Sequence, residues 1–168
     1  MVESRQKSIQ LIEVGANAGI VIVALLCMVI GIKSYWGRGY SRTHNIPIGT
    51  QLNLHGINWG TQPKSIILAL STNCHFCTES APFYRDLVAK CASEHIRTIA
   101  VFPQSAPEAI SYLAGEQVKV DAIKEAALDT IQVSGTPTLI LVDGRGKVQA
   151  AWIGKLSAEQ QNQVFARL

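Results

Sequence analysis

The sequence predicts an α/β domain, with a mixed central sheet flanked by helices, preceded by one transmembrane helix. Two observations lead to this prediction. From residue 64 onward, apolar runs of strand length alternate with stretches of helical period. Earlier in the chain, residues 14–32, "VGANAGIVIVALLCMVIGI", carry no charge. A helix of that length, roughly 28 Å at about 1.5 Å per residue, matches the hydrocarbon thickness of a bilayer.

The apolar segment is best explained as an uncleaved membrane anchor. A buried core helix is one alternative, but no later segment looks able to enclose a helix that is apolar all round. A cleaved signal peptide is the other, and the following residues, "KSYWGRGY", lack the small-residue cleavage site that it needs. Positive charges flank the segment almost equally on its two sides, so charge does not decide its orientation.

We therefore divide the chain into an N-terminal flank, an anchor, a linker and one folded domain, at residues 1–13, 14–32, 33–47 and 48–168. Glycines, a proline and the absence of a helical period predict the linker. The net charge is +3, and the Lys and Arg residues are scattered. This pattern predicts no nucleic-acid partner.

The first half of the domain reads as strand, helix, strand. "KSIILAL", residues 64–70, is a continuous apolar run, as expected for a strand buried on both faces. A helical period runs from Cys77 to about Cys91, and "IRTIAVF", residues 96–102, predicts the next strand. Before them, residues 51–60 alternate weakly and predict a short strand or hairpin arm. The two long strands should pair in parallel through a right-handed crossover.

The second half reads as helices, a hairpin and a final helix. "SAPE", residues 105–108, is a capping-box signature that predicts a short helix, and a second helical stretch is expected over Asp121–Leu128. "TPTLILV", residues 136–142, predicts a third strand, which "DGRGK" turns into an antiparallel fourth, "VQAAWIG". Ser157 and Gln160 form a capping box for the last helix. We expect helices on both faces of the sheet.

Two cysteines follow the first strand directly, at Cys74 and Cys77, and could be half of a metal site, a redox pair or two structural residues. With Cys91 and His95 they have the spacing of a zinc finger. If residues 77–91 form one helix, however, its ends lie roughly 21 Å apart. Zinc ligands must all lie within about 2.3 Å of the metal, so the metal interpretation is disfavoured.

The redox interpretation needs only local geometry. Cys74 is expected at the start of a helix, where free backbone N–H groups stabilise a thiolate, the attacking species in disulfide exchange. His75 is next in the chain and could add an imidazolium. Cys77, one turn into the helix and more buried, would be the resolving thiol.

The segments "STNCHFCTESAPF" and "VSGTPTLILVDGRGKV" together resemble the thioredoxin superfamily, and within it the membrane-anchored TlpA/ResA-type thiol-disulfide oxidoreductases. The resemblance covers roughly residues 48–168. It is carried by the strand–CxxC–helix junction, by Pro82, where the family kinks its active-site helix, and by Thr136-Pro137, which matches the family's cis-proline.

The resemblance implies a thioredoxin-like three-layer fold and an enzyme that exchanges a Cys74–Cys77 disulfide with client proteins. It places Pro137 against the cysteine pair, where the backbone of Thr136 could bind an extended client segment. His75 and Phe76, between the cysteines, would tune the thiolate. No cofactor and no metal are implied. A redox partner would reset the pair.

The resemblance and the anchor at residues 14–32 together predict a single-pass protein of the bacterial inner membrane, in the cell envelope, with its soluble domain in the periplasm or otherwise outside the cytoplasm.

Three departures from the family pattern leave the redox potential and the direction of electron flow open. Leu68 stands where thioredoxins carry a buried acid, and Asn73 stands where they carry tryptophan. Ser80 stands where TlpA/ResA-type proteins often have an acid, and Glu79, one residue earlier, is turned by about 100° on a helix. Three rival functions remain: a copper-binding protein or metallochaperone, a thiol peroxidase, and a non-catalytic interaction domain.

Overall fold

The computed structural model describes Met28 and residues 46–168. Apart from Met28, the predicted anchor at residues 14–32 lies outside the described residues, as does nearly all of the predicted linker. Within the described part, no helix has both the length and the apolar character needed to cross a membrane. Ile46 is already buried in the core, so the folded region begins before residue 48.

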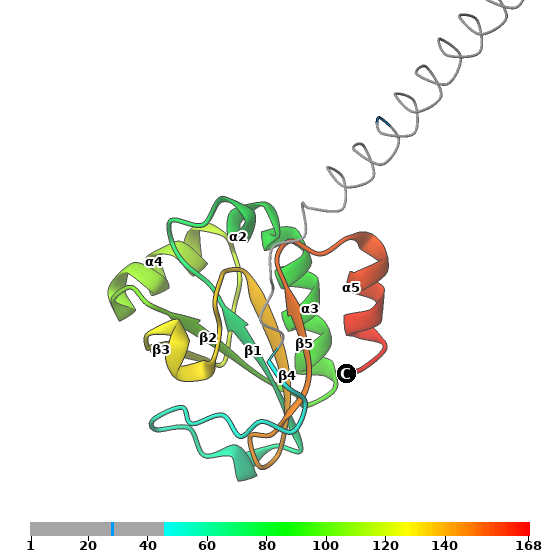
Figure 1. Ribbon diagram of the computed structural model, residues 1–168. Coiled ribbons are helices and arrows are strands. Elements are labelled where there is room, and N and C mark those ends of the chain that lie inside the picture. Colours follow the sequence, from blue (N-terminus) through cyan, green and yellow to red (C-terminus); the bar gives the residue numbers. More distant parts are fainter. Residues whose placement is uncertain (1–27, 29–45) are drawn as a thin grey trace, which may run out of the picture. The chain divides into compact units, whose positions relative to one another are not determined.

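The domain is built on one mixed sheet of five strands in the order β3-β2-β1-β4-β5 (Figure 1). The strands are β1 (Lys64–Ala69), β2 (Arg97–Phe102), β3 (Ala122–Glu125), β4 (Thr138–Asp143) and β5 (Val148–Ile153). β2 is parallel to both β1 and β3, whereas β4 is antiparallel to both β1 and β5. The predicted mixed sheet, with a parallel first pair and an antiparallel last pair, is confirmed.

The long helices cover one face of this sheet. The helical elements are η1 (Trp59–Thr61), α2 (His75–Glu79), α3 (Ala81–Ser93), α4 (Ala106–Gly115), η2 (Leu128–Ile131) and α5 (Ala158–Phe165). Buried residues of α3, α4 and α5 share one core with alternate residues of β1. The chain steps from β1 to β2 to β3 in one direction across the sheet, and right-handed crossovers then place α3 and α4 on the same face.

The opposite face carries no long helix in the described part of the chain, so the expectation of helices on both faces is wrong. The other residues of β1, Ile67 and Ala69, pack there against Leu52 and Leu54 from the N-terminal segment. Ile131 of η2 covers the same core. The strand expected over residues 51–60 is reduced to one bridge between Gln51 and Lys147.

The helix expected over Asp121–Leu128 is also wrong. Ala122–Glu125 pair with β2 as the edge strand β3, and only η2 follows. Pairing with the exposed edge of β2 outweighs the weak helical period of so short a segment. The capping box predicted at Ser105 is not formed, because the Ser105 side chain makes no hydrogen bond to the start of the helix. Instead the Ala106 N–H donates to the Glu125 carboxylate at 3.2 Å.

The helix after the cysteines is divided in two. Ser80 ends α2 and begins α3, and Pro82 lies in the first turn of α3, where its missing N–H costs nothing. The five-residue α2 therefore stands apart from the long α3, at the end of the sheet where β1 ends (Figure 1). The β4–β5 turn lies at the other end, because Asp143 pairs with Lys64 at the start of β1. At the last helix, the predicted Ser157–Gln160 capping box is present.

Candidate active site

Cys74 is the N-cap residue of α2. Its backbone is extended, and its sulfur accepts a hydrogen bond from the Cys77 N–H at 3.2 Å. The Cys74 N–H in turn donates to the Ser71 carbonyl at 3.1 Å. The side chain is half-buried. A sulfur that accepts an N–H bond and still reaches the surface suits attack on a disulfide, because a negatively charged sulfur accepts that bond more strongly than a neutral one.

Cys77 lies one turn further along and is fully buried. Burial, together with a hydrogen bond to Cys74, raises the pKa of the Cys77 thiol to about 12, and a hydrogen bond with the Ser71 backbone opposes that rise. Cys77 therefore holds its proton at neutral pH. The two cysteines are free thiols in the structure. Their environments differ, because the first thiol is half-buried and the second is buried.

Thr136 and Pro137 lie in the loop that enters β4, and the peptide bond between them is cis. Burial and a hydrogen bond with Cys74 raise the pKa of Cys77, and a hydrogen bond with the Thr136 side chain lowers it. The loop that carries Thr136 therefore reaches the buried thiol. The Pro137 carbonyl accepts the Gly154 N–H at 2.7 Å, which ties the loop to the end of β5. The cysteine pair and the loop that holds Thr136 and Pro137 thus lie together, although they are about 60 residues apart in the sequence.

His75 and Phe76, the residues between the cysteines, both face outward. The His75 side chain is 79% exposed, and its Nε2 lies 3.1 Å from Glu79 Oε1, one turn along α2. Phe76 is 54% exposed and its ring lies at a tilt beside the imidazole, with 5.8 Å between the ring centroids. Phe76 is thus one of the few large apolar side chains that the described part of the chain leaves exposed.

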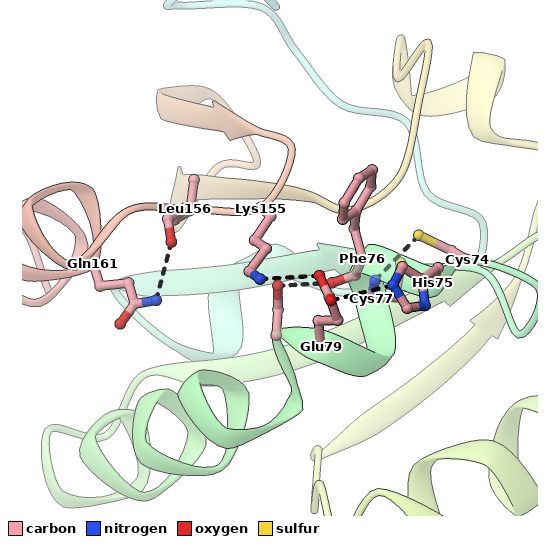
Figure 2. Close-up of polar contacts among 9 residues, drawn as sticks. Cys74, His75, Phe76, Cys77, Glu79, Lys155, Leu156 and Gln161 are labelled. Carbon is pink, nitrogen blue, oxygen red and sulfur yellow. Dashed lines mark hydrogen bonds and ion pairs between the residues drawn. The ribbon is translucent and has the colours of Figure 1, made fainter.

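Glu79 joins α2 to the loop between β5 and α5. Figure 2 shows its carboxylate between His75 and Lys155, whose Nζ lies 2.9 Å from Glu79 Oε2. The hydrogen bond from Lys155 is the main reason why the pKa of Glu79 lies below its usual value, and the charge of His75 acts in the same direction. Sequence reasoning missed Lys155, which is 76 positions from Glu79 and carries no local signal.

Leu68, in the position of the thioredoxin acid, is fully buried and apolar. Hydroxyl groups of other residues hydrogen-bond around α2. Ser80 is buried and donates to the Phe76 carbonyl at 2.8 Å. Tyr112 hydrogen-bonds to Thr78 at 3.3 Å between their hydroxyl oxygens, and burial raises its pKa. Leu68 therefore supplies no carboxylate beneath the cysteine pair, and the side chains around α2 named here carry hydroxyl groups.

The residues of the disfavoured zinc site do not come together. Cys91 is buried in the core face of α3, as predicted, and burial raises the pKa of its thiol to about 12. His95 follows α3 with a positive φ. In the chain from residue 46 onward, no cluster of three or more His, Cys, Asp or Glu side chains is placed to hold a metal ion.

Several solved structures with the same fold are thiol-disulfide oxidoreductases or interchange proteins. The thioredoxin domain of a thiol-disulfide oxidoreductase from Bacteroides vulgatus matches with a TM-score of 0.59 and 14% identity, over 73% of this chain and 97% of its own. A thiol:disulfide interchange protein from a Bacteroides species matches with a TM-score of 0.54 and 16% identity, over 74% and 88%.

A third structure is a secreted Mycobacterium tuberculosis disulfide oxidoreductase homologous to E. coli DsbE, with a TM-score of 0.51 and 13% identity, over 63% of this chain and 82% of its own. No family model matches the sequence, and no curated protein does. The predicted thioredoxin fold is thus confirmed, and the Cys74–Cys77 pair is consistent with a CxxC redox site on that fold.

Proposed function

We propose that this protein is a membrane-anchored thiol-disulfide oxidoreductase that exchanges a Cys74–Cys77 disulfide with client proteins outside the cytoplasm. One observation carries the proposal: a half-buried cysteine caps α2 and accepts the N–H of a fully buried cysteine, whose thiol reaches the Thr136–Pro137 loop. The fold, which it shares with thiol-disulfide oxidoreductases of known structure, supports the same assignment.

The exchange runs in two steps. The Cys74 thiolate attacks one sulfur of a client disulfide, forms a mixed disulfide and releases the other client sulfur as a thiolate, which takes up a proton. Cys77 then loses its proton to solvent and attacks the Cys74 sulfur. The bond to the client breaks, the Cys74–Cys77 disulfide forms and the client leaves as a second thiolate, which is protonated. Two electrons pass from protein to client, and run in reverse the same steps oxidise a client dithiol.

The client would bind at the exposed end of the pair. The Thr136 backbone, beside Cys77, could pair with an extended client segment in the manner of strand addition, with Pro137 leaving the adjoining backbone without an N–H. Phe76, which is 54% exposed, offers an apolar contact to such a segment.

The uncharged segment at residues 14–32 supports an anchor in a bacterial inner membrane, with the folded domain on the extracytoplasmic side. The secreted mycobacterial oxidoreductase of the same fold supports that side as well. A redox partner in the same compartment would return the pair to its starting state.

The reduction potential of the pair tests the proposal. The full chain, in detergent, is equilibrated in graded thiol/disulfide buffers, and alkylated thiols are counted by mass on the peptide that carries both cysteines. A potential near about −120 mV would define an oxidant of clients, and one near about −270 mV or lower a reductant. A pair that never closes under oxidising conditions would overturn the proposal. Tight Cu(I) binding would then favour the metallochaperone alternative.

A further inference from the structure

The turn that precedes Cys74 is held by one side chain from the loop after β2. Gln104 lies in the loop after β2, 33 positions from Ser71. Its Nε2 donates to Ser71 Oγ at 2.8 Å, and its Oε1 accepts the Thr72 N–H at 3.3 Å. Both ends of one amide are therefore used on two successive residues of the turn.

Both cysteines form a hydrogen bond with the backbone of Ser71. Its carbonyl accepts the Cys74 N–H at 3.1 Å, and its hydroxyl accepts the Asn73 N–H at 3.3 Å. Burial and Cys74 raise the pKa of Cys77, and the hydrogen bond with the Ser71 backbone is the largest contribution that lowers it. A shift of Ser71 would therefore move a contact of the attacking cysteine and a contact of the resolving cysteine at once.

Gln104 supplies the side-chain hydrogen bonds that reach Ser71 and Thr72 from outside the turn. The turn leaves β1 after Leu70, whose N–H still donates to the Val101 carbonyl of β2 at 2.9 Å. Beyond Leu70 the ladder between β1 and β2 ends, because their last paired residues are Ala69 and Val101. Beyond that point, the Gln104 side chain connects the turn to the loop after β2. Both hydrogen bonds of Gln104 are half-buried. A group that loses its partner there is hydrated less well than it would be at the surface, so the loss costs free energy.

We propose that Gln104 is a positioning residue for the disulfide-closing step, which it supports by holding Ser71 in the geometry that aligns Cys77 with Cys74. This inference rests on the proposed function. Gln104 touches neither sulfur and acts only through Ser71 and Thr72. Closing needs the two sulfurs aligned within a bond length, whereas the first attack needs only an accessible Cys74, so the closing step should be the more sensitive of the two.

The test separates these two steps with 5,5′-dithiobis(2-nitrobenzoate), using the full chain with Cys27→Ala to remove a competing thiol. Attack by Cys74 breaks the probe disulfide and releases one coloured thiolate. Attack by Cys77 on the Cys74 sulfur then breaks the mixed disulfide and releases a second. The protein loses two electrons and two protons, and one probe disulfide becomes two thiolates. In a Cys77→Ala background only the first release occurs.

We expect Gln104→Leu to slow the second release about fivefold or more, the effect of about one hydrogen bond. In the Cys77→Ala background the first release should change less than about twofold. Gln51→Leu is the matched control, because Gln51 is also a glutamine whose Nε2 donates a long-range hydrogen bond, in this case to the Arg145 carbonyl at 2.7 Å, at the other end of the sheet. It should leave both releases unchanged.

Ser71→Ala supplies a second, smaller variant. If Gln104 acts through Ser71, the double variant Ser71→Ala/Gln104→Leu should close no more slowly than the slower single variant. A closing rate in Gln104→Leu equal to that of the unmodified chain would overturn the inference, as would an equal loss in both steps. If the unmodified chain never gives the second release, the proposed function itself fails.

Discussion

Lys155 Nζ lies 2.9 Å from Glu79 Oε2, and this ion pair joins the helix that carries both cysteines to the loop after β5. The other Glu79 oxygen lies 3.1 Å from His75 Nε2, so one carboxylate bridges a lysine and the histidine that follows Cys74. Because all three side chains are at least one-third exposed, the network should matter more for the charges around Cys74 than for the stability of the fold.

Lys155→Met should raise the pKa of Glu79 towards its usual value, because the hydrogen bond from Lys155 is the largest cause of its lowering. Carboxyl chemical shifts followed through an acid titration measure this change. The lowered pKa contributes stability at neutral pH that is lost as the pH falls through the folded value, and the variant should lose that dependence. Lys147→Met, in the β4–β5 turn, is the control and should leave the pKa of Glu79 unchanged.

His75→Ala should make the Cys74–Cys77 pair more reducing. In its imidazolium form, the side chain next in sequence to Cys74 stabilises the thiolate, and with it the reduced form, so its removal favours the disulfide. Equilibration with glutathione should show a shift of up to about tenfold in the equilibrium constant, or about 30 mV. His95→Ala, after α3, should leave the potential unchanged. A shift towards a more oxidising pair would contradict this role for His75.

The closing step should accelerate with pH, since Cys77 must lose its proton and burial raises the pKa of its thiol to about 12. Below that value, the rate of the second release should rise about tenfold per pH unit, as the thiolate fraction does. Rapid mixing between pH 6 and 9 measures it. A rate that stops rising within that range would show that the pKa of Cys77 is lower than its burial implies.

Thr136→Val should slow closing at any one pH. The Thr136 side chain hydrogen-bonds to Cys77 and counters the rise in pKa that burial and Cys74 cause, so its loss leaves less thiolate. Thr130→Val is the control, because the Thr130 hydroxyl donates only to the Ala127 carbonyl, at 2.6 Å. If both variants close at the rate of the unmodified chain, the Thr136 hydroxyl has no part in this step.

The reduced protein should lose stability above about pH 9, the ordinary pKa of a cysteine thiol. Burial raises the pKa of Cys91 to about 12, so the unfolded chain ionises there while the folded one does not. The stability is therefore complete below the unfolded pKa and is lost as the pH rises towards the folded one. Urea unfolding at pH 8 and pH 10 should show a smaller loss for Cys91→Ala than for the unmodified chain, despite a lower starting stability from the cavity.

Strong local patterns in the sequence determined the long strands, the final capped helix and the cysteine pair. β1, β2, β4 and β5 are apolar runs or hairpin arms between clear turn signals, and Cys74 and Cys77 are brought together by one turn of helix. Such features need few long-range contacts, because spacing and backbone geometry produce them.

Only the tertiary structure decided the remainder. Ala122–Glu125 became a strand because the edge of β2 was free to pair, and the second face of the sheet was covered by the N-terminal segment and η2 instead of a long helix. Lys155 reaches Glu79, and Gln104 reaches Ser71, across 76 and 33 positions. No periodicity or spacing encodes such contacts, since they exist only once the sheet has placed distant strand ends side by side.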